Sequence, residues 1–223
     1  MEIYKIAEDG KENRNSVITN LKPGVKNPNR VNVFVNSEYA FSLDISQVVD
    51  LKIKVGREIS EEELLDFKKA SEYGKLYQRA LEWVLLRPRS EKEVNDYLYK
   101  KIYEKKLDKN YINSIVEKLK ERKYLDDVKF AEWYAENRFV KKGVSKKRLK
   151  MELMKKGISN ETIEDVLEKR NDEEEILKMV AKKRGKYTDE KLIAYLVRQG
   201  FSYSEVKKAV EDSGEGSGEN AEG

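Results

Sequence analysis

Positively charged side chains are concentrated in residues 138–156. This stretch holds nine Lys and Arg residues and one acid, Glu152, so its net charge is +8, whereas the whole chain carries only +4. A local excess of positive charge attracts polyanions, and phosphate contacts supply most of the sequence-independent affinity for nucleic acid. We therefore expect this stretch to bind a polyanion. Its cations are Arg138, Lys141, Lys142, Lys146, Lys147, Arg148, Lys150, Lys155 and Lys156.

Three of these cations, Lys146, Lys147 and Arg148, directly follow Ser145, whose residue type is favoured at a helix N-cap. The helix dipole disfavours positive charge in the first turn by roughly a few tenths of a kcal/mol per residue. Because three successive cations stand where the dipole disfavours them, we infer that an anionic partner offsets this cost. A solvated helix face remains the alternative.

Further candidate binding residues lie outside this stretch. Two flank Pro88 in a predicted loop, three form a smaller cluster, and one lies near the end of a predicted helix. In that order they are Arg87, Arg89, Lys182, Lys183, Arg184 and Arg198. Near a helix end the dipole favours cations regardless of any partner, so a purely local role stays open for Arg198, Lys155 and Lys156.

The composition argues against several classes of enzyme. The chain has no Cys and no His, which removes disulfides, thiolate chemistry, Ser–His–Asp catalysis and imidazole metal ligands. The acids Asp126-Asp127 and those in residues 172–175 stand at predicted helix starts, where acids are expected as caps. We therefore expect no catalytic residue, no metal and no cofactor. Trp83, Trp133 and Tyr134 could stack on bases, but their spacing fits buried helix faces.

These side chains must be positioned by short capped helices. Asp126 is a predicted N-cap with a hydrophobic staple between Leu125 and Phe130, and Gly157 ends the helix that Ser145 begins. A capping box from Ser60 to Glu63 opens an earlier helix, which we expect to run toward Lys69 and to be broken at Gly74.

The helical part repeats weakly. When the caps Ser90, Ser145 and Thr188 are aligned, apolar residues recur four and eight positions later, and another helix precedes and follows each aligned one. The recurring residues are Val94, Leu149 and Leu192, then Leu98, Leu153 and Leu196. The pattern predicts three units of three helices that bury their faces on one another.

The first 59 residues differ from the rest, because apolar residues alternate there with the period of half-buried strands. Asn36-Ser37 reads as a two-residue hairpin turn. The predicted strands are residues 2–8, 17–22, 31–35 and 38–43, followed by a short helix at 45–51. Such a small sheet serves either as a docking or stability module or as a partner-binding edge.

The predicted fold is mainly α: tandem three-helix repeats forming an elongated array, preceded by a small N-terminal β-rich domain. The expected parts are the β-rich domain at 1–59, a linking helix at 60–72, repeats at 73–123, 124–171 and 172–212, and a disordered acidic tail at 213–223. The tail is either solubilising or a decoy for the basic residues. With no long apolar run and no signal-like start, we expect a soluble cytoplasmic monomer.

Residues 70–210 resemble the RecX family, and the order of the matching pieces is more specific than any one of them. They are Ala80-Leu81, Arg87-Pro88-Arg89-Ser90-Glu91-Lys92-Glu93-Val94, Tyr124-Leu125-Asp126-Asp127, Phe130-Ala131, Lys142-Gly143, Lys147-Arg148-Leu149, Glu152-Leu153, Lys156-Gly157-Ile158 and Gly200-Phe201. The N-terminal hairpin and the segment from Gly56 to Leu64 look like the extension of longer members. Two positions depart from the pattern: Lys123 stands where the family usually has Gly, and Asn36-Ser37 where it often has Asp-Gly.

The resemblance implies a non-enzymatic regulator of the RecA recombinase, acting in DNA recombination, DNA repair and the SOS response. Members bind the RecA–single-stranded DNA filament along its groove and inhibit ATP hydrolysis, strand exchange and filament growth. The implied partners are RecA and single-stranded DNA, with no membrane. A general nucleic-acid-binding helical protein, a scaffold for acidic proteins and a carboxylate-metal nuclease are the alternatives.

Overall fold

The computed structural model describes residues 16–25 and 27–215, with only the backbone described for 139–142 and 215. The chain divides into two compact units, Met1–Glu82 with Leu98–Tyr111, and Trp83–Tyr97 with Ile112–Gly223. This division passes through the repeat that we expected at 73–123, so the domain boundaries given above stay predictions. The fold class is as predicted: a small N-terminal sheet comes first along the chain, and helices make up most of the rest.

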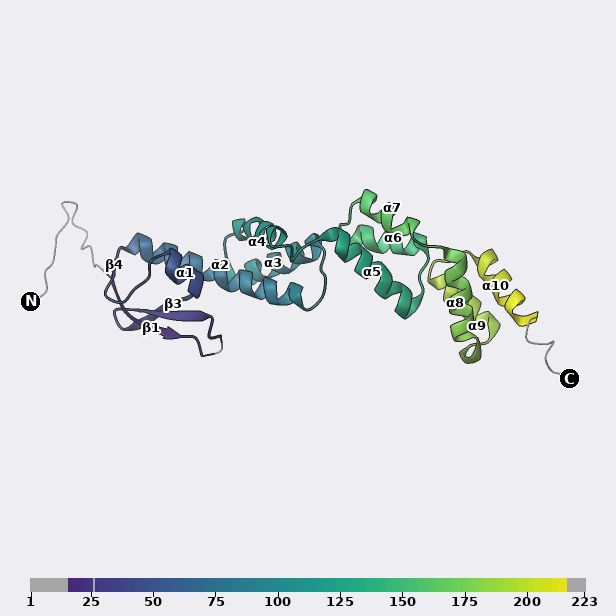
Figure 1. Ribbon diagram of the computed structural model, residues 1–223, viewed down its shortest axis with the longest axis horizontal. Helices are drawn as coiled ribbons and strands as arrows, with labels where there is room; N and C mark the ends of the chain where they lie inside the picture. The colour runs from purple at the N-terminus through teal and green to yellow at the C-terminus, as the bar shows by residue number, and fades with distance from the viewer. Residues whose placement is uncertain (1–15, 26, 216–223) are drawn as a thin grey trace, which may run out of the picture. The chain divides into compact units, whose positions relative to one another are not determined.

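The first unit contains an antiparallel sheet in the order β3-β2-β1-β4 (Figure 1). Its strands are β1 (Ser16–Pro23), β2 (Arg30–Val35), β3 (Glu38–Asp44) and β4 (Glu58–Ile59). Three of these are the predicted strands; the two-residue β4 carries too little pattern to be seen in the sequence. The hairpin turn is confirmed, since Asn36 and Ser37 have φ angles of 49° and 70°. The strand predicted at residues 2–8 lies outside the described residues.

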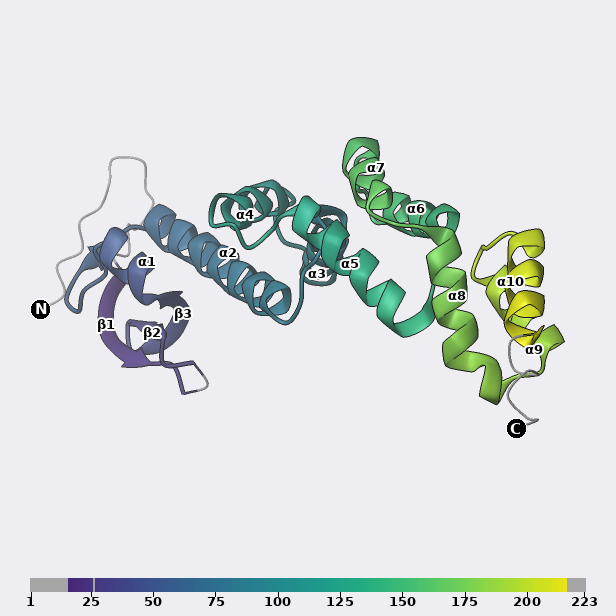
Figure 2. The same ribbon diagram turned by 45° about the vertical axis from the view of Figure 1, so that its right-hand side comes forward.

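One face of the sheet is buried against helices. Ile18, Val33 and Leu43 are fully buried, and Phe41 packs on Phe67 of the following helix with ring centroids 5.8 Å apart. The short helix α1 (Ile45–Asp50) begins at a capping box formed by Asp44. Figure 2 shows the strands curving strongly beside α1 and the start of α2.

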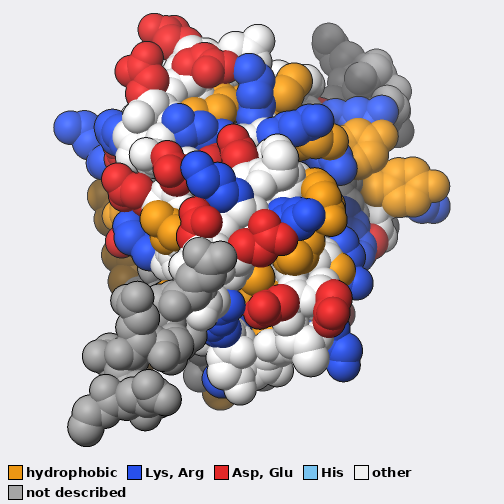
Figure 3. All heavy atoms as spheres, turned by 90° about the vertical axis from the view of Figure 1, so that its right-hand side faces the viewer, with side chains coloured by type: hydrophobic (Ala, Val, Ile, Leu, Met, Phe, Trp, Pro, Cys, Tyr) orange, Lys and Arg blue, Asp and Glu red, His pale blue; other side chains and the backbone are white. Residues whose placement is uncertain are grey.

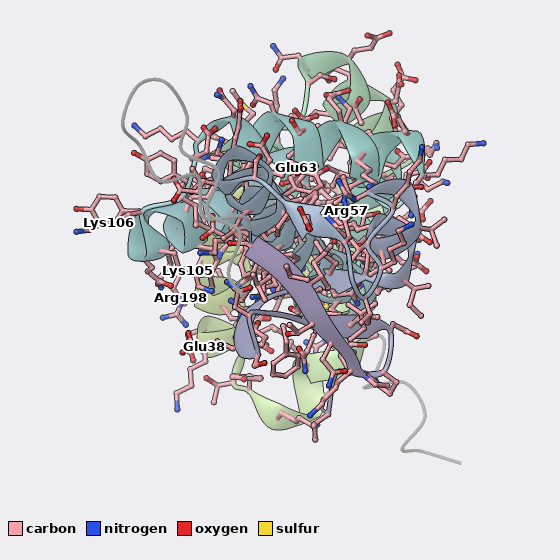
Figure 4. All side chains as sticks on the ribbon, turned by 90° about the vertical axis from the view of Figure 1, so that its left-hand side faces the viewer. Glu38, Arg57, Glu63, Lys105, Lys106 and Arg198 are labelled. Atoms are coloured by element: carbon pink, nitrogen blue, oxygen red, sulfur yellow. The ribbon has the colours of Figure 1, made fainter. Side chains whose placement is uncertain are left out.

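Helix α2 (Glu61–Leu85) is a single helix of 25 residues, so the predicted break at Gly74 is wrong. A Cβ on Gly74 would lie 2.7 Å from Oε1 of Gln47, whose amide donates to the Ala70 carbonyl at 2.9 Å. Glycine is therefore used there for close approach of a side chain, not for a helix end. The predicted capping box is confirmed: Glu63 N–H donates to Ser60 Oγ at 3.1 Å, and Ser60 N–H donates to Glu63 at 3.0 Å. Figure 4 labels Glu63 together with Arg57, which pairs with it at 2.5 Å.

The remaining helices follow the predicted periodicity. They are α3 (Glu91–Lys105), α4 (Asn110–Glu121), α5 (Asp127–Lys142), α6 (Lys146–Lys155), α7 (Asn160–Glu168), α8 (Asp172–Lys183), α9 (Asp189–Arg198) and α10 (Tyr203–Glu215). The predicted caps Asp126 and Ser145 accept N–H groups from the first turns of α5 and α6. Thr188 makes no such bond. Helix α10 includes Ser213 to Glu215, so the tail predicted as disordered from 213 is helical there, and its remainder lies outside the described residues.

Two three-helix groups of the second unit have their own cores. Helices α5, α6 and α7 pack together around Phe130, Leu149, Leu153 and Ile163, and α10 packs on α8 and α9 (Figure 1). The core of the latter group contains Ile176, Leu192, Leu196 and Val206. Trp133 and Tyr134 pack against Phe130 with ring centroids 6.0 and 5.6 Å away, so the core interpretation of these two aromatics is confirmed.

Within the second unit, an acid at the start of one helix caps an earlier helix. Asp127, the first residue of α5, accepts the Glu91 N–H of α3 at 2.7 Å, and Asp172, the first residue of α8, accepts the Lys146 N–H of α6 at 2.9 Å. Each carboxylate satisfies an N–H group that has no partner inside its own helix. These acids are caps, as predicted, but for helices distant in sequence.

A glycine completes each of these junctions. A Cβ on Gly157 would lie 2.9 Å from Lys92 Cβ, and one on Gly200 would lie 2.5 Å from Ser145 Oγ. Both glycines have positive φ, 80° and 95°. At both junctions, therefore, an acid and a glycine of one helical group contact the N-terminal turn of a helix in the preceding group.

Candidate polyanion-binding face

The basic stretch is built on α6 and the segments that flank it. Ser145 begins α6 by accepting the Arg148 N–H at 3.2 Å, which places Lys146 and Lys147 in the first turn. Asp172 lies at the same helix end through its bond to the Lys146 N–H. A carboxylate at this position offsets part of the dipole cost that the sequence argument treated as uncompensated.

Glu152 neutralises two of the candidate cations. Arg138 Nε lies 2.7 Å from one oxygen of Glu152, and Arg148 Nε lies 3.2 Å from the other. The Tyr134 hydroxyl also donates to Glu152, at 3.0 Å. Burial tends to lower the pKa of Arg138, but Tyr134 and Glu152 outweigh it and raise that pKa. Arg148 is further fixed because it donates to the Arg198 carbonyl at 2.5 Å.

Acids remote in sequence neutralise two more. Lys150 pairs with Glu164 at 2.5 Å, and Lys156 pairs with Glu93 at 2.5 Å. Glu93 also binds Arg87 at 3.1 Å. Burial would raise the pKa of Glu93, but its bonds to Lys156 and Arg87 lower it. The expectation of uncompensated charge is therefore wrong for four cations of the stretch: Arg138, Arg148, Lys150 and Lys156.

Three cations remain: Lys146 and Lys147 in the first turn of α6, which we call the basic face, and Lys155 in its last turn. Within the part of the chain that the structure describes, none of the three forms an ion pair. Lys146 and Lys147 line a hollow of about 300 Å³ together with Lys150, Glu164, Leu167 and Glu168. The side chains of Lys141 and Lys142 lie outside the described residues.

The other predicted cations are mostly engaged. Arg184 donates to Ser213 Oγ at 2.5 Å and to the Val210 carbonyl at 3.0 Å, and Lys183 lies 4.6 Å from the centre of the Tyr195 ring. Lys182 and Arg198 are exposed. On the face presented in Figure 3, blue and red side chains alternate instead of separating into regions of one sign.

Sequence reasoning missed Glu93 and Glu164 because their partners lie 63 and 14 positions away. It also missed that Asp127 and Asp172 cap other helices. The sequence did contain a signal for the capping role of Asp127 and Asp172. Each is the first residue of the first helix in a three-helix group.

Among the residues that the structure describes, no helix combines the length and apolar character needed to cross a bilayer. Nor do those residues include a cluster of three carboxylates able to hold a metal ion. The fold and the basic face together define a class: a helical-repeat protein that begins with a small sheet and carries many charged side chains on its surface.

Comparison with known proteins identifies the family within this class. The family model for the regulatory protein RecX N-terminal domain matches residues 16–60, and the model for the second RecX three-helix domain matches residues 126–167. Regulatory protein RecX of Bacillus pumilus is 33% identical over 215 residues, which cover 92% of this chain and 80% of that protein. The chain belongs to the RecX family.

Two further comparisons agree with this family assignment. Regulatory protein RecX of Bacillus subtilis is 34% identical over 117 residues, 52% of this chain and 43% of that protein. A crystal structure of a regulatory protein RecX superposes with a TM-score of 0.65 at 23% identity, covering 88% of this chain and 99% of the other. At this identity the likeness shows a shared fold.

Proposed function

We propose that this chain binds RecA–single-stranded DNA filaments and inhibits RecA ATP hydrolysis, strand exchange and filament extension. Membership of a family of regulatory proteins supports this proposal, and so does the resemblance of residues 87–94 and 124–158 to segments of RecA regulators. The protein acts in this proposal as a cytoplasmic monomer, without a cofactor.

The basic face carries the binding part of the proposal. Lys146 and Lys147 are cations without an ion pair among the described residues, and they border a hollow at the N-terminal end of α6. Phosphate oxygens are attracted there by the two ammonium groups, since the Lys146 and Arg148 N–H groups of the helix end are already bound by Asp172 and Ser145. We propose that these lysines meet DNA phosphate or an acidic surface of RecA, while Arg138 and Arg148 hold α5, α6 and α9 in place.

A charge reversal of Lys146 and Lys147 tests this assignment. The double variant Lys146→Glu and Lys147→Glu is expected to fold normally and to need about ten times more protein for half-inhibition of RecA ATPase on single-stranded DNA. Arg148 stays unchanged, because it also holds Glu152 and the Arg198 carbonyl. If two phosphate contacts are lost, the slope of log affinity against log salt falls by about 1.4.

The matched control places the same charge change elsewhere in the unit. Lys191 and Lys208, on α9 and α10, are exposed and form no hydrogen bond or ion pair among the described residues. The variant Lys191→Glu with Lys208→Glu should inhibit like the unchanged protein. Equal loss in both double variants would show a general charge effect, and unchanged inhibition in the first would remove the basic face from the interface.

The nuclease alternative gains no support from the described residues, because they include no group of three acids that could hold a metal ion, and Asp127 and Asp172 serve as caps. A general nucleic-acid-binding role is separated from the proposal by the partner. Inhibition that persists when single-stranded DNA is held in large excess over RecA argues for contact with the filament, whereas inhibition relieved by free DNA argues for sequestration.

A further inference from the structure

A second cationic hollow, of about 260 Å³, lies in the second unit beside the loop between α2 and α3. Its rim is apolar on one side, where Leu85 and Tyr124 are 62% and 43% exposed. Its cationic lining includes Arg89 and Lys123. The basic face described above does not include it.

Arg89 is held in a fixed orientation. Its guanidinium carbon lies 3.8 Å from the centre of the Trp83 ring, and Trp83 stacks on Tyr97 with centroids 4.6 Å apart and planes 13° from parallel. A guanidinium stacked on an aromatic platform keeps its N–H fork available for a planar anion while losing little freedom on binding.

The surroundings of Arg89 are short of negative charge. Its Nε is buried and has no hydrogen-bond partner among the described residues. The nearby carboxylate, Glu93, is already shared by Arg87 and Lys156. Burial lowers the pKa of Arg89, and Arg87 lowers it further, against the opposing effect of Glu93. A partly desolvated cation beside another cation is stabilised by an added anion.

Lys123 adds a second cation, at a backbone position that costs energy. It follows α4 with a φ of 60°, its N–H donates to the Lys120 carbonyl at 2.8 Å, and the structure shows no ion pair for it among the described residues. A non-glycine residue in this left-handed region is strained. Three other charged residues line the hollow and are paired: Lys129 with Asp126, which also lines it, at 3.6 Å, and Arg87 with Glu93 at 3.1 Å. Lys123 and Arg89 are therefore the cations that an anion would find.

We propose that this hollow binds an acidic peptide segment of a protein partner, with a carboxylate held by Arg89 and Lys123 and an apolar side chain against Leu85 and Tyr124. A carboxylate matches the guanidinium fork in a bidentate manner. A single-stranded nucleic acid stacks successive bases on aromatic rings, but Trp83 is already engaged by Arg89 and Tyr97, which leaves one aromatic ring in the lining, Tyr124. The inference rests on the proposed function only in that the latter supplies a protein partner.

Two lysines of matched geometry allow a sharp test. Lys106 follows α3 with a φ of 53°, is exposed, and is not among the residues that line the hollow; Figure 4 labels it together with Lys105. Glycine at either lysine position removes one positive charge and relieves a left-handed backbone, so Lys123→Gly and Lys106→Gly should both fold.

The probe is a fluorescein-labelled, end-blocked peptide of sequence Glu-Leu-Glu-Glu-Leu-Glu, with labelled pentathymidylate as a nucleic-acid probe of equal charge. By fluorescence anisotropy, Lys123→Gly is expected to raise the peptide Kd about fivefold and Arg89→Gln about tenfold, whereas Lys106→Gly stays within twofold. Thermal midpoints measured in parallel show that each variant is folded.

Three outcomes would overturn the inference: no peptide binding by the unchanged protein, equal effects of Lys123→Gly and Lys106→Gly, or an effect of Lys123→Gly on pentathymidylate alone. The last would assign the hollow to nucleic acid. The peptide assay contains neither RecA nor a filament, so its failure would not decide the inhibition test of the basic face. In the same way, failure of the inhibition test would not decide whether the hollow binds the peptide.

Discussion

Replacing Gly200 by alanine is expected to lower the free energy of unfolding of the second unit by about 2 kcal/mol. Gly200 has a φ of 95°, and an added Cβ would lie 2.5 Å from Ser145 Oγ. That hydroxyl is the N-cap of α6, so relieving the contact displaces a cap that is worth about 1 kcal/mol. The left-handed backbone adds a cost of about the same size.

Urea unfolding followed by tryptophan fluorescence measures this effect, since both tryptophans, Trp83 and Trp133, belong to the second unit. Gly185→Ala is the matched control, because Gly185 has no atom within 4 Å of an added Cβ and no positive φ. The control should stay within about 0.5 kcal/mol of the unchanged protein. A loss at Gly200 no larger than at Gly185 would mean that the junction does not depend on this close approach.

Replacing Glu175 by glutamine is expected to stabilise the protein at pH 8 by about 3 kcal/mol and to change little at pH 4.5. Glu175 of α8 is 3% exposed, its Oε2 has no hydrogen-bond partner among the described residues, and burial raises its pKa to about 7. Arg170, Lys178 and Lys182 oppose the rise, and Asp172 adds to it.

The direction of the pH dependence follows from the raised pKa. The folded chain holds the Glu175 proton more tightly than the unfolded chain, whose carboxyl has a pKa near 4.5. The stability linked to this proton is complete below about pH 4.5 and is lost as the pH rises through about 7. Glutamine keeps the neutral shape at every pH, so the difference between the two proteins should grow over this interval.

Glu174→Gln provides the comparison, since Glu174 is exposed and pairs with Lys178 at 3.5 Å on the same helix. Its effect should stay within about 0.5 kcal/mol at each pH that is measured. Urea midpoints between pH 4.5 and 8 measure both variants. A constant difference between Glu175→Gln and the unchanged protein would show that this carboxyl is already ionised or solvated in the fold.

The helices and the hairpin followed from local pattern. Apolar spacing and the caps Ser145 and Asp126 placed α5 and α6 within a residue or two, because these signals act within one helical turn. The turn at Asn36-Ser37 was equally local, and both residues take the positive φ that such a turn requires. Lys123 also takes a left-handed conformation, with a φ of 60°, at a cost in backbone strain.

The candidate site was only partly predictable. The cations were visible in the sequence, but their neutralisation was not, because Glu93 reaches Lys156 across 63 positions and Glu164 reaches Lys150 across 14. Gly74 shows the same limit for the backbone. Its residue type predicts a helix break, but in the structure the helix continues and the Gln47 side chain packs closely against this glycine. In both cases the deciding contact comes from a residue that no local window contains.

For this protein, the sequence by itself determined the helical class, the N-terminal hairpin, the caps and the family, since each depends on residues close along the chain or on their order. Only the tertiary structure decided which cations stay free of ion pairs, which acids clamp one helical group to the next, and where the second hollow lies. The physical reason is that charge compensation and close approach depend on distance in space, and the turns between helices set that distance.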